Sequence, residues 1–98
     1  MTVRYSARAL GQIAEIVAKI SIDDPGGAAR FARRVESLAV LVSRHPAVGR
    51  QTSLAEIRVL PAKPFPYLVF YQPLPYASGI VVLRVRHMAR KEDWRSGR

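Results

Sequence analysis

The chain has 98 residues and a formal net charge of +9, from sixteen lysines and arginines against seven aspartates and glutamates. Its length allows a single domain, and the lack of cysteine excludes a disulfide scaffold, a thiolate metal site and a cysteine nucleophile. Hydrophobic residues make up 49% of the chain, too many for a disordered basic tail. No apolar run is long enough to span a membrane. We therefore expect a cytoplasmic protein with an acidic partner, either a nucleic acid or another protein.

The first elements in chain order are a short strand and a helix. Residues 2–5 alternate in polarity and predict a strand, and Ser6 has the side chain of a helix N-cap. Apolar residues then recur every three or four positions, which predicts an amphipathic helix over residues 7–20. Its apolar face comprises Leu10, Ile13, Ala14, Val17 and Ile20. The opposite face carries Gln12, Glu15 and Lys19.

A second helix is predicted over residues 25–43. Asp23 and Asp24 can cap its start, and Pro25 suits the first helical position. Pro46 ends it, because proline disfavours a helical conformation in the preceding residue. The apolar stripe of this helix comprises Ala28, Phe31, Ala32, Val35, Leu38, Ala39 and Val42. The basic residues that lie mostly off the stripe are Arg30, Arg33 and Arg34.

Three strands follow, at residues 57–60, 67–71 and 80–86. The second is almost continuously apolar and aromatic, which is typical of a central, buried strand. The third alternates in its second half. One side carries Leu83, Val85 and His87, and the other carries Arg84 and Arg86.

These elements predict an α+β fold. Helices joined by a short turn form an antiparallel hairpin, and consecutive strands with short connections pair antiparallel. The fold is then an N-terminal strand, an antiparallel helix hairpin and a three-stranded antiparallel meander, with all strands in one sheet and the helices on one of its faces. Residues 1–98 form one domain, and residues 88–98 form a basic C-terminal tail.

Short motifs follow one another along most of the chain. They are Tyr5-Ser6 with Ala9-Leu10 and Ile13, Pro25 with Ala28-Ala29 and Phe31, His45-Pro46 with Gly49-Arg50, Ile57-Arg58, the segment 66–71, and the segment 82–87 with Arg90. In this order, length and charge, they resemble the RelE/ParE superfamily of toxins from bacterial type II toxin–antitoxin modules. The resemblance implies a small toxin that an acidic-tailed antitoxin silences.

The resemblance favours the ParE-like branch. Members of this branch inhibit DNA gyrase and are not known to need a catalytic residue for it. It implies a ParD-like antitoxin as partner, operator DNA contacted only through that antitoxin, no membrane, no metal and no cofactor. We expect the gyrase-binding residues at the end of the last strand and in the tail: Arg84, Arg86, His87, Arg90, Lys91 and Trp94.

The alternative is a RelE-like ribosome-dependent endoribonuclease. Attack by a ribose 2′-hydroxyl needs a base, cations and an acid. Glu56 or His87 could transfer the proton, and Arg58 and Arg90 could stabilise the phosphate charge. Residue 88, however, is methionine where a catalytic tyrosine would strengthen this reading. A third possibility is a degenerate member that only binds its antitoxin and operator DNA as a co-repressor.

Several of these residues also have plain structural interpretations. His87 could anchor the tail through a backbone hydrogen bond, and Trp94 could pin the tail to the domain. Arg58 could form an ion pair with Glu56, two residues away on the same strand face. Tyr67 and Tyr71 are expected in the core.

The antitoxin surface is expected between the helices and the sheet. A partner segment that is disordered alone could place a helix or strand there. The residues expected to contact it are Leu10, Ile13, Val17, Arg30, Arg33, Arg34 and Arg58.

Overall fold

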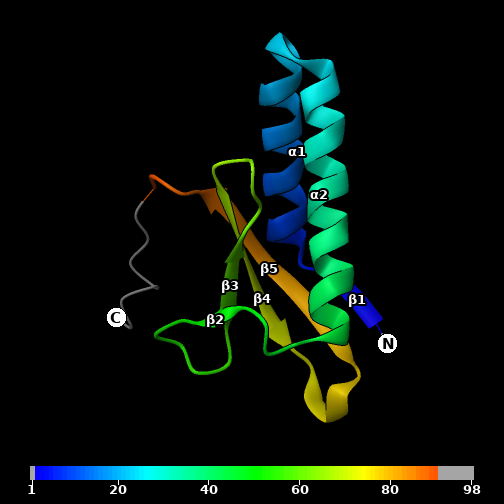
Figure 1. The fold of residues 1–98 in the computed structure, drawn as a ribbon, viewed down its shortest axis with the longest axis vertical. Coiled ribbons are helices and arrows are strands. Elements are labelled where there is room, and N and C mark those ends of the chain that lie inside the picture. Colours follow the sequence, from blue (N-terminus) through cyan, green and yellow to red (C-terminus); the bar gives the residue numbers. More distant parts are fainter. Residues whose placement is uncertain (1, 91–98) are drawn as a thin grey trace.

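The computed structural model describes residues 2–90, which form two helices and one five-stranded sheet. In chain order the elements are β1 (Thr2–Tyr5), α1 (Ala7–Asp23), α2 (Pro25–Arg44), β2 (Arg50–Gln51), β3 (Arg58–Pro61), β4 (Tyr67–Pro73), the 3₁₀ turn η1 (Pro75–Ala77) and β5 (Gly79–His87). The helices form a long antiparallel hairpin that projects beyond the sheet (Figure 1). The predicted α+β class is confirmed.

The sheet has the strand order β1-β5-β4-β3-β2. The meander of β3, β4 and β5 is antiparallel as expected, and β1 joins it in parallel beside β5. The expected fold had four strands, and the fifth is β2, where Arg50 pairs with Val59 and Gln51 with Arg58. Two exposed polar residues carry no apolar alternation, so the sequence offered no signal for this short edge strand.

The core lies between the helix hairpin and one face of the sheet. Tyr67, Val69 and Tyr71 of β4 belong to this core, which confirms their expected burial. Phe31 of α2 packs against Tyr67, with ring centroids 5.2 Å apart, and against Phe65, at 5.4 Å. The aromatic contacts therefore join the second helix to the central strand.

The buried face of α1 differs in part from the expected one: Ile13, Val17 and Ile20 pack against the core as expected, whereas two other members of the predicted face do not. Ile16 and Ala9 are its buried residues, whereas Leu10 is 54% exposed and Ala14 is also exposed. Gln12, expected on the solvent side, faces β5 instead, because its Oε1 accepts a hydrogen bond of 2.8 Å from the Val85 backbone N–H. The prediction was wrong for these residues because it assigned the buried face from apolar side chains alone. A glutamine counts as polar in such an assignment, even where its side chain accepts a hydrogen bond from a strand amide.

The bulge between β4 and β5 changes which side chains enter the core. Phe70 pairs with Arg84 and Tyr71 with Val82, so Leu83 is the extra residue of β5. Val82 therefore occupies the core position, fully buried. The expectation that Leu83 continues the line of Val85 and His87 was wrong, because a bulge shifts the alternation by one residue.

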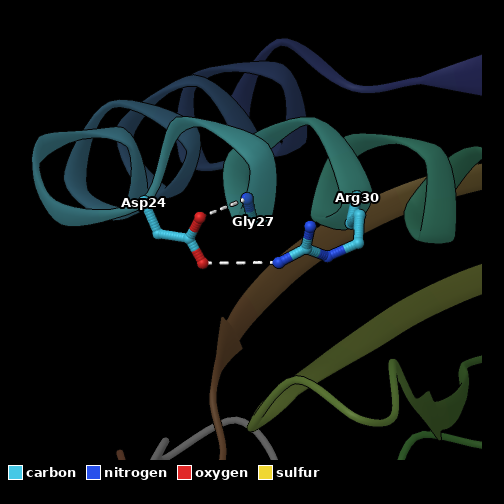
Figure 2. Close-up of polar contacts among 3 residues, drawn as sticks. All are labelled: Asp24, Gly27 and Arg30. Carbon is cyan, nitrogen blue, oxygen red and sulfur yellow. Dashed lines mark hydrogen bonds and ion pairs between the residues drawn. The ribbon is translucent and has the colours of Figure 1, made fainter.

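Asp24 links the two helices (Figure 2). Its backbone N–H donates to the Ile20 carbonyl at the end of α1, and its carboxylate accepts from the Gly27 N–H, 2.9 Å away, at the start of α2. The second carboxylate oxygen forms an exposed ion pair of 3.3 Å with Arg30. A Cβ on Gly27 would lie 2.5 Å from this carboxylate, so glycine leaves room for the capping group.

The predicted apolar stripe of α2 is confirmed apart from Ala32, which is exposed.

Removing this cap should destabilise the helix hairpin. We expect Asp24→Ala to lower the free energy of unfolding by about 1 kcal/mol, because one N-terminal amide of α2 loses its acceptor. Asp24→Asn keeps an acceptor and loses only the exposed ion pair, so it should cost much less. Urea unfolding of both variants measures the difference. Equal losses would show that the charge, and not the cap, carries the stabilisation.

Candidate functional site

The basic end of β5 is the first candidate surface. Its side chains lie on both faces of the sheet: Arg86 pairs with Leu68 and Arg84 with Phe70, on the face away from the helices, whereas His87 pairs with Tyr67. Arg84 and Arg86 are only 7% and 4% exposed. They are buried arginines and do not form the open basic surface that the net charge suggests. Their part in target binding stays a prediction.

Arg86 holds the chain where it leaves the sheet. Its Nη1 donates to the His87 carbonyl at 3.0 Å and also to the Arg90 carbonyl. Its guanidinium carbon lies 5.3 Å from the centre of the Phe70 ring, in cation–π range. Hydrogen bonds from this one arginine therefore hold the backbone of residues 87–90 in place.

His87 is exposed and serves the same turn. Its Nδ1 accepts a hydrogen bond of 3.0 Å from the Ala89 N–H, and its ring packs edge-on against Tyr67. This contact matches the structural interpretation, in which the histidine anchors the start of the tail. Arg90 is exposed beside it, whereas Lys91 and Trp94 lie outside the described residues.

A cleft of about 200 Å³ separates this turn from α1. His87, Arg90 and Lys19 contribute positive or titratable groups, and Glu15 contributes a carboxylate. The cleft is thus polar and of mixed charge.

Arg58 and Tyr71 together hold the segment between α2 and β2. The Arg58 Nη1 donates to the Gly49 carbonyl at 2.7 Å and to the Ala47 carbonyl at 3.3 Å. The Tyr71 hydroxyl accepts from the Gly49 N–H at 2.9 Å and donates to the Pro46 carbonyl at 2.6 Å. Burial raises the pKa of Tyr71, and the Gly49 hydrogen bond and the Arg58 charge oppose that rise.

The suggested ion pair of Arg58 with Glu56 does not form within residues 2–90. Glu56 is exposed in the loop before β3, and Arg58 uses its guanidinium on backbone carbonyls. The expectation that both lie on one strand was wrong, because β3 begins at Arg58.

The residues of the nuclease alternative are only partly brought together: His87 and Arg90 line one cleft, whereas Arg58 and Glu56 do not line it. Arg58 pairs with Tyr71, and His87 pairs with Tyr67, four residues away along β4. Four residues of a strand span about 13 Å. Since Arg58 turns toward Gly49 beyond that end, the two side chains do not converge on one phosphate.

The helix hairpin provides the second candidate surface. Arg30 and Arg33 are exposed on α2, and the Arg34 Nε donates to the Lys63 carbonyl at 2.8 Å, which ties α2 to the loop between β3 and β4. The three arginines line a depression of about 280 Å³ together with Ser37, Pro64 and Phe65. On α1, Leu10 is exposed, and Ile13 and Val17 are half-buried against the core.

Sequence reasoning missed a hollow on the face of the sheet away from the helices. It measures about 290 Å³ and is lined by Arg50, Gln51, Thr52, Val59, Leu68, Phe70 and Arg86. The missing signal was the register: only the pairing of β3, β4 and β5 shows that these residues share a face.

We find no candidate metal cluster and no membrane-spanning helix in the part of the chain that the structure describes. Residues 2–90 contain no cluster of three or more metal-ligating side chains. The helices within that range are also too short or too polar to cross a bilayer.

A family model described as the ParE toxin of the type II toxin–antitoxin system parDE matches residues 3–92. The chain belongs to the ParE toxin family. The toxin is also 32% identical over 85 residues to the "Putative toxin Y4kP" of Sinorhizobium fredii, and the alignment covers 87% of this chain and 85% of that protein. Membership of a type II system means that the partner of this toxin is an antitoxin.

The fold of the toxin is similar to a solved structure described as the chromosomal ParDE TA system from P. aeruginosa. The TM-score is 0.75 at 14% sequence identity, over 89% of this chain and 95% of that chain. At so low an identity the likeness concerns the fold alone, which agrees with the helix hairpin and sheet of the toxin.

Proposed function

We propose that the toxin arrests growth by binding DNA gyrase, and that an acidic ParD-like antitoxin neutralises it. The observation that carries the proposal is the family match over residues 3–92. Gyrase as the target is what the resemblance to ParE-like members implies. The site geometry also supports it, because it does not favour the nuclease alternative. Arg58 and His87, which a nuclease would bring to one phosphate, serve two separate loops of the fold.

The surface proposed for gyrase is the exposed end of β5. His87 and Arg90 are its described members, and Lys91 and Trp94 follow in the part of the tail outside the described residues. Arg86 contributes indirectly, since it fixes the backbone that presents these side chains. Arg84 is buried on the same face of the sheet, beside Phe70. Binding by such a surface requires shape and charge, and no acid–base pair.

Purified toxin tests this proposal directly. Added to gyrase and relaxed plasmid DNA, it should abolish supercoiling, and prior mixing with the cognate antitoxin should restore it. Normal supercoiling at toxin concentrations that stop growth, with transcripts cleaved in the same cells, would instead assign the toxin to the ribosome.

His87→Ala separates the two targets in cells. Loss of one exposed contact should weaken growth arrest by no more than about tenfold, the equivalent of ~1.4 kcal/mol. Removing a general acid would weaken it by about 10²–10⁴-fold. Growth after induction measures the effect, and circular dichroism controls for the fold. A loss in the larger range would reject the gyrase model.

The antitoxin surface is proposed on the helix hairpin, which carries apolar side chains on α1 and basic side chains on α2. The apolar part comes from Leu10, which is exposed, and from Ile13 and Val17, which are half-buried. The charge comes from Arg30, Arg33 and Arg34, which line the depression on α2. Arg58 is half-buried and bonded to backbone carbonyls, so its contribution is to shape the sheet edge. An acidic segment of the antitoxin fits the charge of this surface.

Charge reversal on α2 tests that placement. We expect Arg33→Glu to weaken binding of the antitoxin about tenfold and to reduce its salt dependence. Arg44→Glu is the matched control: it makes the same charge change on the same helix, about 16 Å further along. Titration calorimetry at two salt concentrations compares them. If both variants lose affinity equally, net charge alone attracts the antitoxin and the depression on α2 is not its site.

A further inference from the structure

The sheet has a second face that the helices do not cover. The core between helices and sheet contains Tyr67, Val69 and Tyr71 of β4, so the alternate residues Leu68 and Phe70 point to the other side. Besides the hollow of about 290 Å³ that Leu68 and Phe70 line, this side has an adjoining hollow of about 380 Å³. The second hollow is mostly apolar, and its lining residues are Val48, Arg50, Val59, Leu60, Pro61, Leu68 and Met88. Among residues 2–90, both helices lie on the opposite side of the sheet.

This face is basic as well as apolar. Arg86 and Arg50 line the first hollow, and Arg84 lies beside Phe70 through the strand register. An occupant that fits it would combine a large apolar group with carboxylates.

The described chain ends at the rim of this face. Arg86, which lines the hollow, holds the Arg90 carbonyl, and the side chain of Met88 lines the adjoining hollow. The residue that follows Arg90 therefore starts next to this face.

The eight residues that follow have the required length and chemistry. Residues 91–98 lie outside the described range and read Lys-Glu-Asp-Trp-Arg-Ser-Gly-Arg. Extended, they reach about 26 Å, whereas the distance across the sheet from β5 to β2 is three strand spacings, about 15 Å. They contain Trp94, the one tryptophan of the chain, directly after Glu92 and Asp93.

We propose that residues 91–98 dock across this face, with the Trp94 ring in the hollow beside Leu68 and Phe70 and the Glu92 and Asp93 carboxylates toward the arginines. In that case Trp94, predicted above as a gyrase contact, holds the tail to the sheet together with Glu92 and Asp93, and only the cations of the tail are left for the target. A partner that uses this face must first displace the tail. The inference goes beyond the proposed function and does not depend on gyrase being the target.

Fluorescence of Trp94 tests the proposal in the 98-residue chain, which contains no other tryptophan. Docking predicts blue-shifted emission and acrylamide quenching several times weaker than in the urea-unfolded chain. Leu68→Lys should raise the quenching toward the unfolded value, because it places a charge in the hollow. Ile22→Lys, at a site 80% exposed on α1, is the matched control and should change nothing.

A second variant guards against a folding defect in Leu68→Lys. The double variant Glu92→Gln, Asp93→Asn changes no residue of the described range 2–90 and should also increase the acrylamide quenching of Trp94. Native quenching equal to that of the unfolded chain would overturn the proposal. So would shielding that neither variant relieves, because Trp94 would then lie elsewhere, and shielding lost on dilution, which would assign the face to the tail of a second copy.

Discussion

Gly79→Ala should lower the free energy of unfolding of the toxin by about 3–5 kcal/mol. Gly79 adopts φ +143°, a conformation that alanine rarely reaches, and an added Cβ would lie 1.9 Å from the Thr2 carbonyl oxygen. Thr2 and Gly79 form the first pair of the β1–β5 ladder. The variant can relieve the clash only by separating the two strands. Urea unfolding of the purified variant measures the loss.

Gly11→Ala is the control for this result, because it adds the same methyl group elsewhere. Gly11 lies on the exposed side of α1, and its added Cβ would meet nothing within 4 Å. Alanine is the better helix former, so this variant should be more stable by about 0.5–1 kcal/mol. The two substitutions should thus have opposite signs. A Gly79→Ala protein as stable as the native chain would show that β1 does not need the close approach.

Tyr71→Phe should lower the free energy of unfolding by about 1–3 kcal/mol. The ring stays, but the buried Gly49 N–H loses its acceptor and the Pro46 carbonyl loses its donor. Gly49 packs closely on this side chain, since an added Cβ would lie 2.7 Å from the Tyr71 ring. Denaturant unfolding gives the magnitude. A loss well below 1 kcal/mol would mean that water replaces the hydroxyl.

The same variant should change the alkaline stability of the toxin. The pKa of Tyr71 is raised from 10.0 by burial, and that of Tyr5 is raised by burial and by the Glu36 charge. Above pH 10 the unfolded chain therefore binds fewer protons than the fold. The stability that comes from these raised pKa values is complete below the unfolded value and is lost as the pH rises through the folded values. Thermal midpoints should fall less steeply in that range for Tyr71→Phe than for the native chain.

The helices and the meander could be predicted because their signals are local. Apolar spacing placed both helices within a few residues of their observed ends, and β4 was recognised from an unbroken apolar run. The misassignments depend on pairing between distant segments. The sequence does not show that Gln12 meets the Val85 amide, or that Leu83 is the extra residue of a bulge. The parallel pairing of β1 with β5 is likewise visible only in the fold.

Prediction of the site was limited by the same cause. The sequence does not show which groups surround a charged side chain in the fold. Arginines that the fold buries therefore count in the net charge equally with exposed ones. Arg86 and Arg58 spend their hydrogen bonds on backbone carbonyls of the chain itself. Arg33, which the structure leaves exposed on α2, has the environment that its sequence position implied. The net charge therefore overstates the charge available to partners.

The parallel pairing of β1 with β5 also constrains how the chain can reach its fold. Residues 2–5 pair with residues 79–82, so the loop that must close contains both helices and the strands β2 to β4. Closure over such a separation is slow compared with helix formation. During synthesis the helix hairpin can form early, but β5, which lies between β1 and β4, is available only after residue 87 has been made. The complete sheet, and with it the surface at the end of β5, therefore forms only after all the other described strands have been synthesised.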